Sequence, residues 1–159
     1  CGQFMEGADL SVRLLSQLQV KPGHRVLEIG TGSGFLTAVI GRLAERVISI
    51  ERYKTLIASA QRRLEQLSIR NVILRQLDGL NGLPGEGTFD RIVSTAAYPA
   101  MPRFYAEQLV SGGMLLVPLM VEEERCIMVR LTKTGSRFER EDLFEVPFLP
   151  LQPKIAQHL

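Results

Sequence analysis

The chain has 159 residues, of which 45% are hydrophobic and 23% are charged, and its formal net charge at pH 7 is +2. This length suits one domain with a full core, and the small net charge does not argue for a nucleic-acid partner; none is expected. Two cysteines are too few for a disulfide scaffold, and no apolar run reaches the roughly 20 residues of a membrane span. We therefore expect a single domain over residues 1–159, located in a reducing cytoplasm, without a membrane partner.

The first elements are predicted to be a loop, a helix and a buried strand. Residues 1–8 show no period, and Asp9 is a good N-cap for a helix that runs through Leu18. After a turn at residues 21–23, the apolar run Arg25–Ile29 is short enough for a buried strand. Because the sequence begins at Cys1 rather than Met, we expect that an N-terminal segment is missing.

Three glycines at alternate positions, Gly30, Gly32 and Gly34, follow this strand, and an apolar helical pattern begins at Phe35. A strand, a tight glycine turn and a helix form a nucleotide-binding βαβ unit, in which glycine lets the backbone approach a ligand. The spacing differs from the G-x-G-x-x-G of dinucleotide sites, and Glu28 precedes the first glycine by two residues. A carboxylate there suits a ligand with an ammonium group and no phosphates. The turn therefore predicts S-adenosylmethionine as cofactor, and the alternative is a tight turn in another α/β protein.

Two more acidic residues, Glu51 and Asp78, come after predicted strands, so we expect them at the same carboxyl-terminal edge of the sheet as the glycine turn. Glu51 ends a strand at residues 47–50 and lies 21 residues past Gly30, where an acid typically hydrogen-bonds ribose hydroxyls. The alternatives for Glu51 are a solvated charge or a cap of the amphipathic helix predicted at residues 53–67. Asp78 follows a third strand that begins at residues 71–74. It could accept a hydrogen bond from an adenine amino group, although Asp-Gly is also a common turn pair.

The second half of the chain adds three or more strands. A fourth strand at Phe89–Ser94 leads into the small residues 95–97, which should line a pocket at the carboxyl ends of the strands. Pro102 fits the first position of a short helix to residue 109, and a turn at 111–113 precedes a strand at 114–118. Strand-like segments at 125–131 and 140–148 indicate a hairpin. The predicted fold is α/β, a Rossmann-like doubly wound, mostly parallel sheet with an antiparallel C-terminal hairpin.

These motifs resemble the protein-L-isoaspartate O-methyltransferase family from about residue 2 to residue 151. Residues 26–34 match its S-adenosylmethionine loop, 50–52 its ribose-binding strand end, 95–97 a typical segment and 148–151 its Phe-Val-Pro-Leu ending. The resemblance implies a Rossmann-like sheet and S-adenosylmethionine-dependent methylation of L-isoaspartyl or D-aspartyl carboxylates in damaged proteins. It also implies a protein or peptide partner that carries isoaspartyl residues.

The motif positions supply the candidate site residues. For cofactor binding these are Glu28, Gly30, Thr31, Gly32, Ser33, Gly34, Glu51, Arg52, Asp78, Gly79 and Thr95. For catalysis they are Gln3 and Glu6, from a loop that the family closes over the cofactor, and again Thr95. No metal site is expected. A carboxylate acceptor is already ionised at pH 7 and needs no general base, so catalysis would be mainly positioning and desolvation.

The loop ahead of the first helix departs from the family pattern. Family members carry Gly-Gln-Thr-Ile-Ser, whereas this chain has Gly-Gln-Phe-Met-Glu at residues 2–6. A Glu6 carboxylate that pointed inward would repel a substrate carboxylate. Leu77 stands where the family has glycine beside its adenine-binding Asp, and it could narrow the adenine pocket. Two alternatives stay open: a methyltransferase of this fold with a different acceptor, and a non-catalytic cofactor-binding module.

Overall fold

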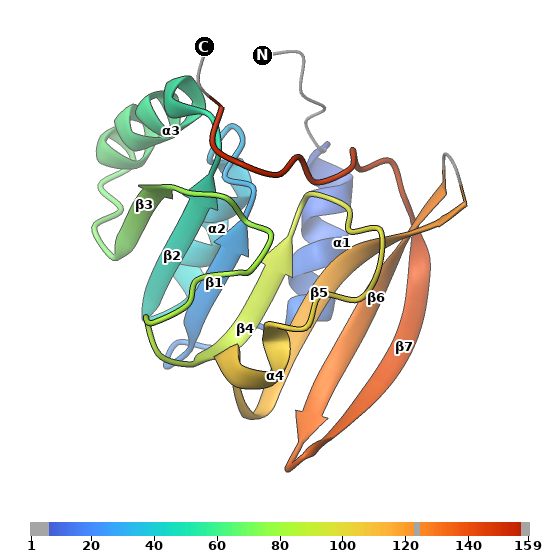
Figure 1. Ribbon diagram of the computed structural model, residues 1–159. Helices are drawn as coiled ribbons and strands as arrows, with labels where there is room; N and C mark the ends of the chain where they lie inside the picture. The colour runs from blue at the N-terminus through green and yellow to red at the C-terminus, as the bar shows by residue number, and fades with distance from the viewer. Residues whose placement is uncertain (1–6, 123–124, 157–159) are drawn as a thin grey trace.

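The structure, a computed structural model, describes residues 7–122 and 125–156, which form one seven-stranded sheet with flanking helices (Figure 1). The sheet has the order β3-β2-β1-β4-β5-β6-β7. The strands are β1 (Arg25–Ile29), β2 (Arg46–Glu51), β3 (Val72–Gln76), β4 (Phe89–Ser94), β5 (Leu109–Glu122), β6 (Arg125–Thr134) and β7 (Arg137–Val146). The helices are α1 (Ala8–Leu18), α2 (Phe35–Leu43), α3 (Lys54–Gln66) and α4 (Tyr105–Gln108).

The pairing of the strands confirms the predicted fold class. Neighbouring strands from β3 to β5 run parallel, whereas β6 and β7 pair antiparallel at the C-terminal edge. Parallel neighbours need crossover connections, and α2 and α3 supply two of them. All the parallel strands therefore end on the same side of the sheet, where ligands bind in open α/β folds.

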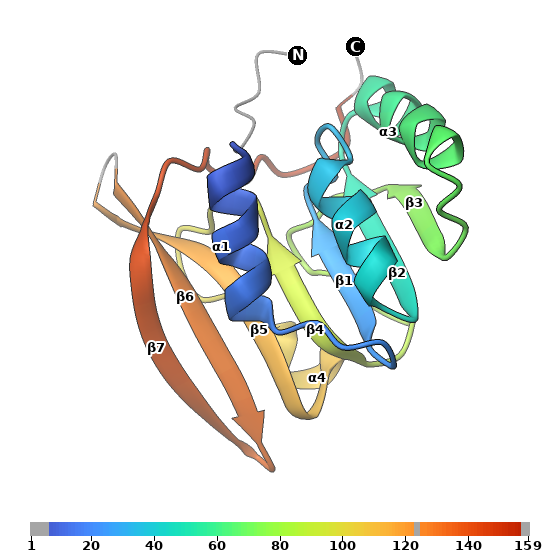
Figure 2. The ribbon, with the colours of Figure 1, turned by 180° about the vertical axis from the view of Figure 1, so that it is seen from behind.

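Two apolar clusters sandwich the sheet. Figure 2 shows α1 and α2 over one face, where Leu14 and Ile40 pack against inward-facing strand residues such as Val26. On the opposite face, Leu27 belongs to the second cluster, which the loops and the α4 region cover (Figure 1). Because both faces of the sheet are covered, β1 is buried continuously from Val26 to Ile29 and shows no alternation of buried and exposed residues.

Three local predictions from the sequence are wrong. Helix α4 begins at Tyr105 with Phe104 at its N-cap position, so Pro102 lies ahead of the helix and not at its first position. Helix α1 has Gly7 at its N-cap position and begins at Ala8, so Asp9 lies in its first turn, where a negative charge complements the helix dipole. The turn expected at residues 111–113 belongs instead to β5, which begins at Leu109. The register between β4 and β5 shifts next to this segment, so the small residues produce an irregularity in the pairing and not a break.

A buried arginine joins β4 to the end of α1. Arg91 is only 7% exposed, and its Nε donates a hydrogen bond of 2.7 Å to the carbonyl of Leu18, the last residue of the helix. One of its terminal nitrogens donates to the Asp90 carbonyl at 2.8 Å. Terminal helix carbonyls have no partner within the helix, so this side chain supplies one.

We expect Arg91→Leu to lower the free energy of unfolding by about 2–3 kcal/mol, because a buried carbonyl loses its charged donor. Urea denaturation measures the change. Arg62→Leu on the exposed surface of α3 is the matched control, and its effect should stay below about 0.5 kcal/mol. Equal losses in the two variants would show that the contact with α1 contributes nothing specific.

Within the described ranges, no helix is long and apolar enough to span a membrane. The same residues contain no group of three or more His, Cys, Asp or Glu side chains that could hold a metal ion.

Candidate active site

A cavity that is open to solvent lies at the carboxyl ends of the parallel strands. Its walls come from the tips of β1 and β2, the start of α3, the loop after β3, the end of β4 and the C-terminal segment at residues 148–152. Among the predicted site residues, those that line it are Gly30, Gly32, Glu51, Arg52, Gly79 and Thr95. The fold thus brings most of the widely spaced motifs to one place.

The glycine turn between β1 and α2 requires glycine for two separate reasons. Gly30, Gly32 and Gly34 have φ values of +97°, +52° and +80°, a region that side chains disfavour. A Cβ on Gly30 would overlap Thr95 Oγ1, and one on Gly34 would lie 2.9 Å from the Cβ of Ala60. A Cβ on Gly32 would meet no heavy atom within 4 Å, so this peptide faces open space. The turn therefore packs tightly at its two ends and presents its middle to the cavity.

Glu51 connects the glycine turn to the start of α3. Its Oε2 accepts a hydrogen bond of 3.1 Å from the Gly32 amide, while Oε1 accepts from the amides of Arg52 and Tyr53 at 2.8 and 3.1 Å. The side chain is 7% exposed and lines the cavity. Helix α3 begins at Lys54, so Glu51 bonds the segment that leads into the helix and does not cap the helix itself. Ribose binding is compatible with these contacts because each carboxylate oxygen can accept more than one hydrogen bond.

Glu28 lies beneath the turn and is not among the described residues that line the cavity. It is fully buried, and its Oε2 accepts hydrogen bonds from Thr37 Oγ1 at 2.5 Å and from Ser49 Oγ at 2.6 Å. The Ser49 hydroxyl lies 2.6 Å from that of Thr31, a predicted cofactor residue that also points into this network. Glu28 and Thr31 therefore support the turn from below. The structure does not place their side chains at the ligand surface.

Thr95, which follows β4, and Ser33 of the turn support the two ends of the turn. Thr95 Oγ1 donates a hydrogen bond of 2.9 Å to the Gly30 carbonyl, which joins the tips of β4 and β1. Ser33 accepts the Phe35 amide at 3.3 Å with its hydroxyl, and its carbonyl accepts a 2.8 Å hydrogen bond from Arg63 of α3. The first amide of helix α2, that of Phe35, therefore has a partner in the turn.

The loop after β3 forms another wall. Leu77 and Gly79 line the cavity, so the side chain that replaces the family's glycine does face it. The carboxylate of Asp78 accepts the Leu80 amide at 2.9 Å and the Lys154 amide at 2.6 Å. Asp78 thus links this wall to the C-terminal segment, and its own side chain is not among the described cavity-lining groups.

Sequence reasoning missed the C-terminal wall and the contribution of α3. Residues 148–152 line the cavity, held by hydrogen bonds of 2.9 Å from the Ala97 amide to the Leu149 carbonyl and 2.7 Å from the Leu151 amide to the Ala97 carbonyl. Tyr53 and Leu56 line it from α3 and the residue before it. The Phe-Leu-Pro-Leu ending carried the only sequence signal for this wall. Gln3 and Glu6 lie outside the described residues.

Comparisons with known proteins agree with this geometry. The model of the family "Protein-L-isoaspartate(D-aspartate) O-methyltransferase" matches residues 3–156. The chain is 60% identical to a protein-L-isoaspartate O-methyltransferase of Rhizobium meliloti over 159 residues, which cover 100% of this chain and 78% of the relative. A protein of the same name from Parvibaculum lavamentivorans is 42% identical, with 99% of this chain and 72% of the relative covered.

Two solved structures are also similar. A protein-L-isoaspartate O-methyltransferase aligns with a TM-score of 0.83 and 26% identity over 96% of this chain, which spans about half (52%) of that structure. A Plasmodium falciparum structure with the same family name, in complex with S-adenosyl-L-homocysteine, aligns with a TM-score of 0.80 and 24% identity, covering 96% of this chain and 77% of that one.

Proposed function

Because this chain belongs to the protein-L-isoaspartate(D-aspartate) O-methyltransferase family, we propose that it methylates free carboxylates of L-isoaspartyl and D-aspartyl residues in damaged proteins. It is an S-adenosylmethionine-dependent methyltransferase. The observation that carries the proposal is the contact between Glu51 and the Gly32 amide, because it places a carboxylate beside an open glycine turn at the cavity. Its partner is a damaged protein or peptide.

The described residues fit this cofactor. The peptide of Gly32 faces space that a side chain would fill, so the backbone there can approach a ligand closely. We propose that the glycine turn holds the methionine part, that Glu51 accepts the ribose hydroxyls, and that the loop with Asp78 and Gly79 contacts adenine. Arg52 borders the same wall, where its Nε donates a 3.2 Å hydrogen bond to the Lys154 carbonyl.

The chemistry requires positioning more than proton transfer. The cofactor supplies an electrophilic methyl group on a sulfonium centre for in-line attack by the acceptor. An acceptor carboxylate is ionised at neutral pH, so the protein has to orient it and exclude water. Apolar side chains suited to excluding water line the cavity, including Ile29, Leu56 and Leu149. Among the described cavity residues the ionisable side chains are Glu51, Arg52 and Tyr53, and both Glu51 oxygens already accept backbone hydrogen bonds.

The assignments on the acceptor side remain proposals. We propose that Gln3 and Glu6 contribute to the closing loop, and that Thr95 acts through the Gly30 carbonyl to which its hydroxyl donates. Residues 1–159 as one domain, a cytoplasmic location and the lack of nucleic-acid or membrane partners are further proposals. They are supported by the single sheet of the described residues and by the small net charge of +2.

Two matched peptides and labelled S-adenosylmethionine test the function. One peptide carries aspartate and the other isoaspartate at the same position, and base-labile methyl ester is counted. We expect label on the isoaspartyl peptide alone, which would also show that Glu6 is a tolerated change. Label on neither peptide, with the cofactor still bound in calorimetry, would refute isoaspartyl methylation and favour another acceptor or a non-catalytic role.

A further inference from the structure

The loop at residues 77–83, here called the β3 loop, is held by contacts from three other parts of the chain. The Tyr98 hydroxyl donates a hydrogen bond of 2.7 Å to the Gly79 carbonyl. The Gln108 amide group donates to the Asn81 carbonyl at 2.9 Å and accepts the Leu83 amide at 2.8 Å. The backbone of the C-terminal segment reaches Asp78. A wall of the cofactor cavity thus depends on side chains that do not line the cavity.

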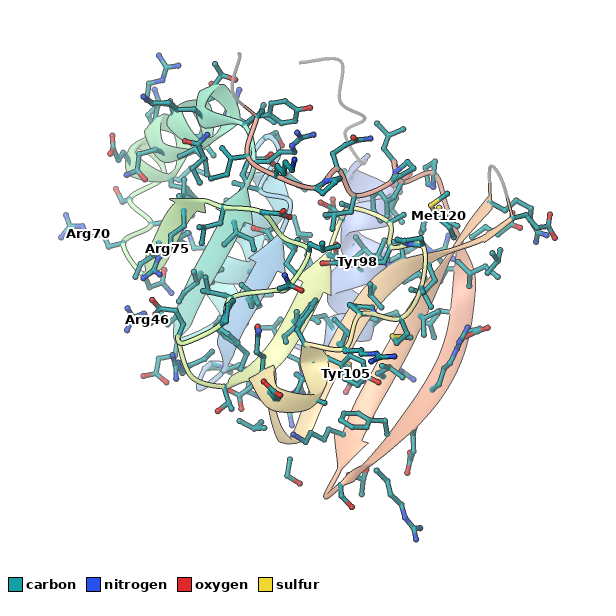
Figure 3. The ribbon with its side chains drawn as sticks, in the orientation of Figure 1. Arg46, Arg70, Arg75, Tyr98, Tyr105 and Met120 are labelled. Carbon is teal, nitrogen blue, oxygen red and sulfur yellow. The ribbon has the colours of Figure 1, made fainter. Side chains whose placement is uncertain are left out.

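Tyr98 is well suited to hold another group in place, because its own position is fixed. It is 2% exposed, its amide donates to the Pro118 carbonyl at 2.9 Å, and its carbonyl accepts the Met120 amide at 2.9 Å. Its ring centroid lies 6.2 Å from that of Phe104. Figure 3 shows Tyr98 in the middle of the molecule, beyond the end of β4 and next to the β3 loop. Burial raises the pKa of Tyr98 well above its ordinary value, so the hydroxyl stays a donor.

Gly79 is the residue at which this contact reaches the cavity. It lines the cavity, and a Cβ on it would overlap Cγ2 of Ile29 at the tip of β1. Its peptide is therefore fixed between β1 on one side and the Tyr98 hydroxyl on the other. The Gly79 carbonyl also accepts the Gly82 amide at 3.1 Å, so loss of the hydroxyl leaves the turn within the loop bonded.

We propose that Tyr98 is a positioning residue for the cofactor: its hydroxyl holds the Gly79 peptide, and with it Asp78, in the place that the adenine end of S-adenosylmethionine requires. This inference rests on the proposed function for the identity of the cofactor. Gln108 holds the far half of the β3 loop, so removal of the Tyr98 hydroxyl should release only the half that borders the cavity.

The test compares Tyr98→Phe with Tyr105→Phe, which also removes one phenolic hydroxyl. Tyr105 packs edge-on against Phe138 at 4.8 Å and is not among the described residues that line the cavity (Figure 3). We expect Tyr98→Phe to weaken S-adenosylhomocysteine binding about fivefold by calorimetry, as for loss of one hydrogen bond. The KM for S-adenosylmethionine should rise by a similar factor. The KM for the isoaspartyl peptide and kcat at saturating cofactor should stay within about twofold of wild type.

The readouts separate positioning from a general loss of structure. Hydrogen exchange at the amides of residues 78–80 should become faster in Tyr98→Phe and stay unchanged in Tyr105→Phe, while the Gly82 amide should stay protected in both. Unchanged affinity for S-adenosylhomocysteine in Tyr98→Phe would overturn the proposal, as would an equal loss in Tyr105→Phe. A wild-type protein that binds S-adenosylhomocysteine but methylates neither peptide would refute the proposed function, while weaker binding by Tyr98→Phe would still support the positioning role.

Discussion

Gly30→Ala is expected to abolish measurable cofactor binding and to lower the free energy of unfolding by about 2–4 kcal/mol. Two costs combine at this residue. Its φ of +97° is one that alanine adopts only with strain, and the new Cβ would overlap Thr95 Oγ1. The Thr95 hydroxyl donates to the Gly30 carbonyl, so relief of the overlap would break the hydrogen bond that joins the tips of β1 and β4.

Gly135→Ala is the matched control for this prediction. Gly135 lies between β6 and β7 with a φ of +63°, and a Cβ there would meet no atom within 4 Å. The Gly135→Ala substitution should lower the free energy of unfolding by about 1 kcal/mol, because alanine is strained in the left-handed conformation. It should not change cofactor affinity. Urea denaturation and calorimetry with S-adenosylhomocysteine measure both variants. Near-normal affinity in Gly30→Ala would show that the turn does not contact the cofactor.

The double variant Gly30→Ala/Thr95→Ala separates the two costs. Removal of the Thr95 hydroxyl eliminates the overlap but leaves the backbone strain, so about 1–2 kcal/mol of the lost stability should return. Cofactor binding should recover only in part, because the Gly30 peptide still has the wrong backbone preference and lacks its partner on β4. No recovery of stability would assign the whole defect to backbone strain.

The sequence alone predicted those parts of the site that depend on neighbouring residues in the chain, namely the strands, the glycine turn and the acid at a strand end. The segments Arg25–Ile29 and Phe89–Ser94 became strands with the predicted bounds. The three alternating glycines predicted a tight turn, and all three have a positive φ. The acid at the end of the second strand, Glu51, does line the cavity.

Features of the site that depend on contacts between distant parts of the chain could not be predicted from the sequence. Residues 111–113 have turn composition, yet they lie within β5, because Leu109 and Met114 on either side of them both pair with β4. The orientation of Glu28 was hidden, because a strand buried on both faces has no alternation to show which side a residue occupies. The C-terminal wall depends on the contacts of Ala97 with residues 149 and 151, more than 50 positions away, and no local pattern reveals them.

Glu51→Ala is expected to weaken S-adenosylmethionine binding by about 2–3 kcal/mol, or about 30- to 150-fold. The substitution removes the proposed acceptor for the ribose hydroxyls. It also removes the carboxylate that accepts hydrogen bonds from the amides of Gly32, Arg52 and Tyr53. The glycine turn and the segment that leads into α3 are then no longer bonded to one side chain. Because these two effects act on the same ligand, the loss should exceed that of a single hydrogen bond. Calorimetry with S-adenosylhomocysteine measures it.

Two further variants separate these effects. Glu45→Ala removes an exposed acid just before the opposite end of the same strand, and it should leave affinity unchanged, which excludes a general effect of net charge. Glu51→Gln keeps one acceptor oxygen and the side-chain shape, so it should retain part of the affinity that Glu51→Ala loses. If Glu51→Ala bound the cofactor like wild type, the ribose assignment would be wrong. If it lost stability without losing affinity, Glu51 would serve only to hold the turn against α3.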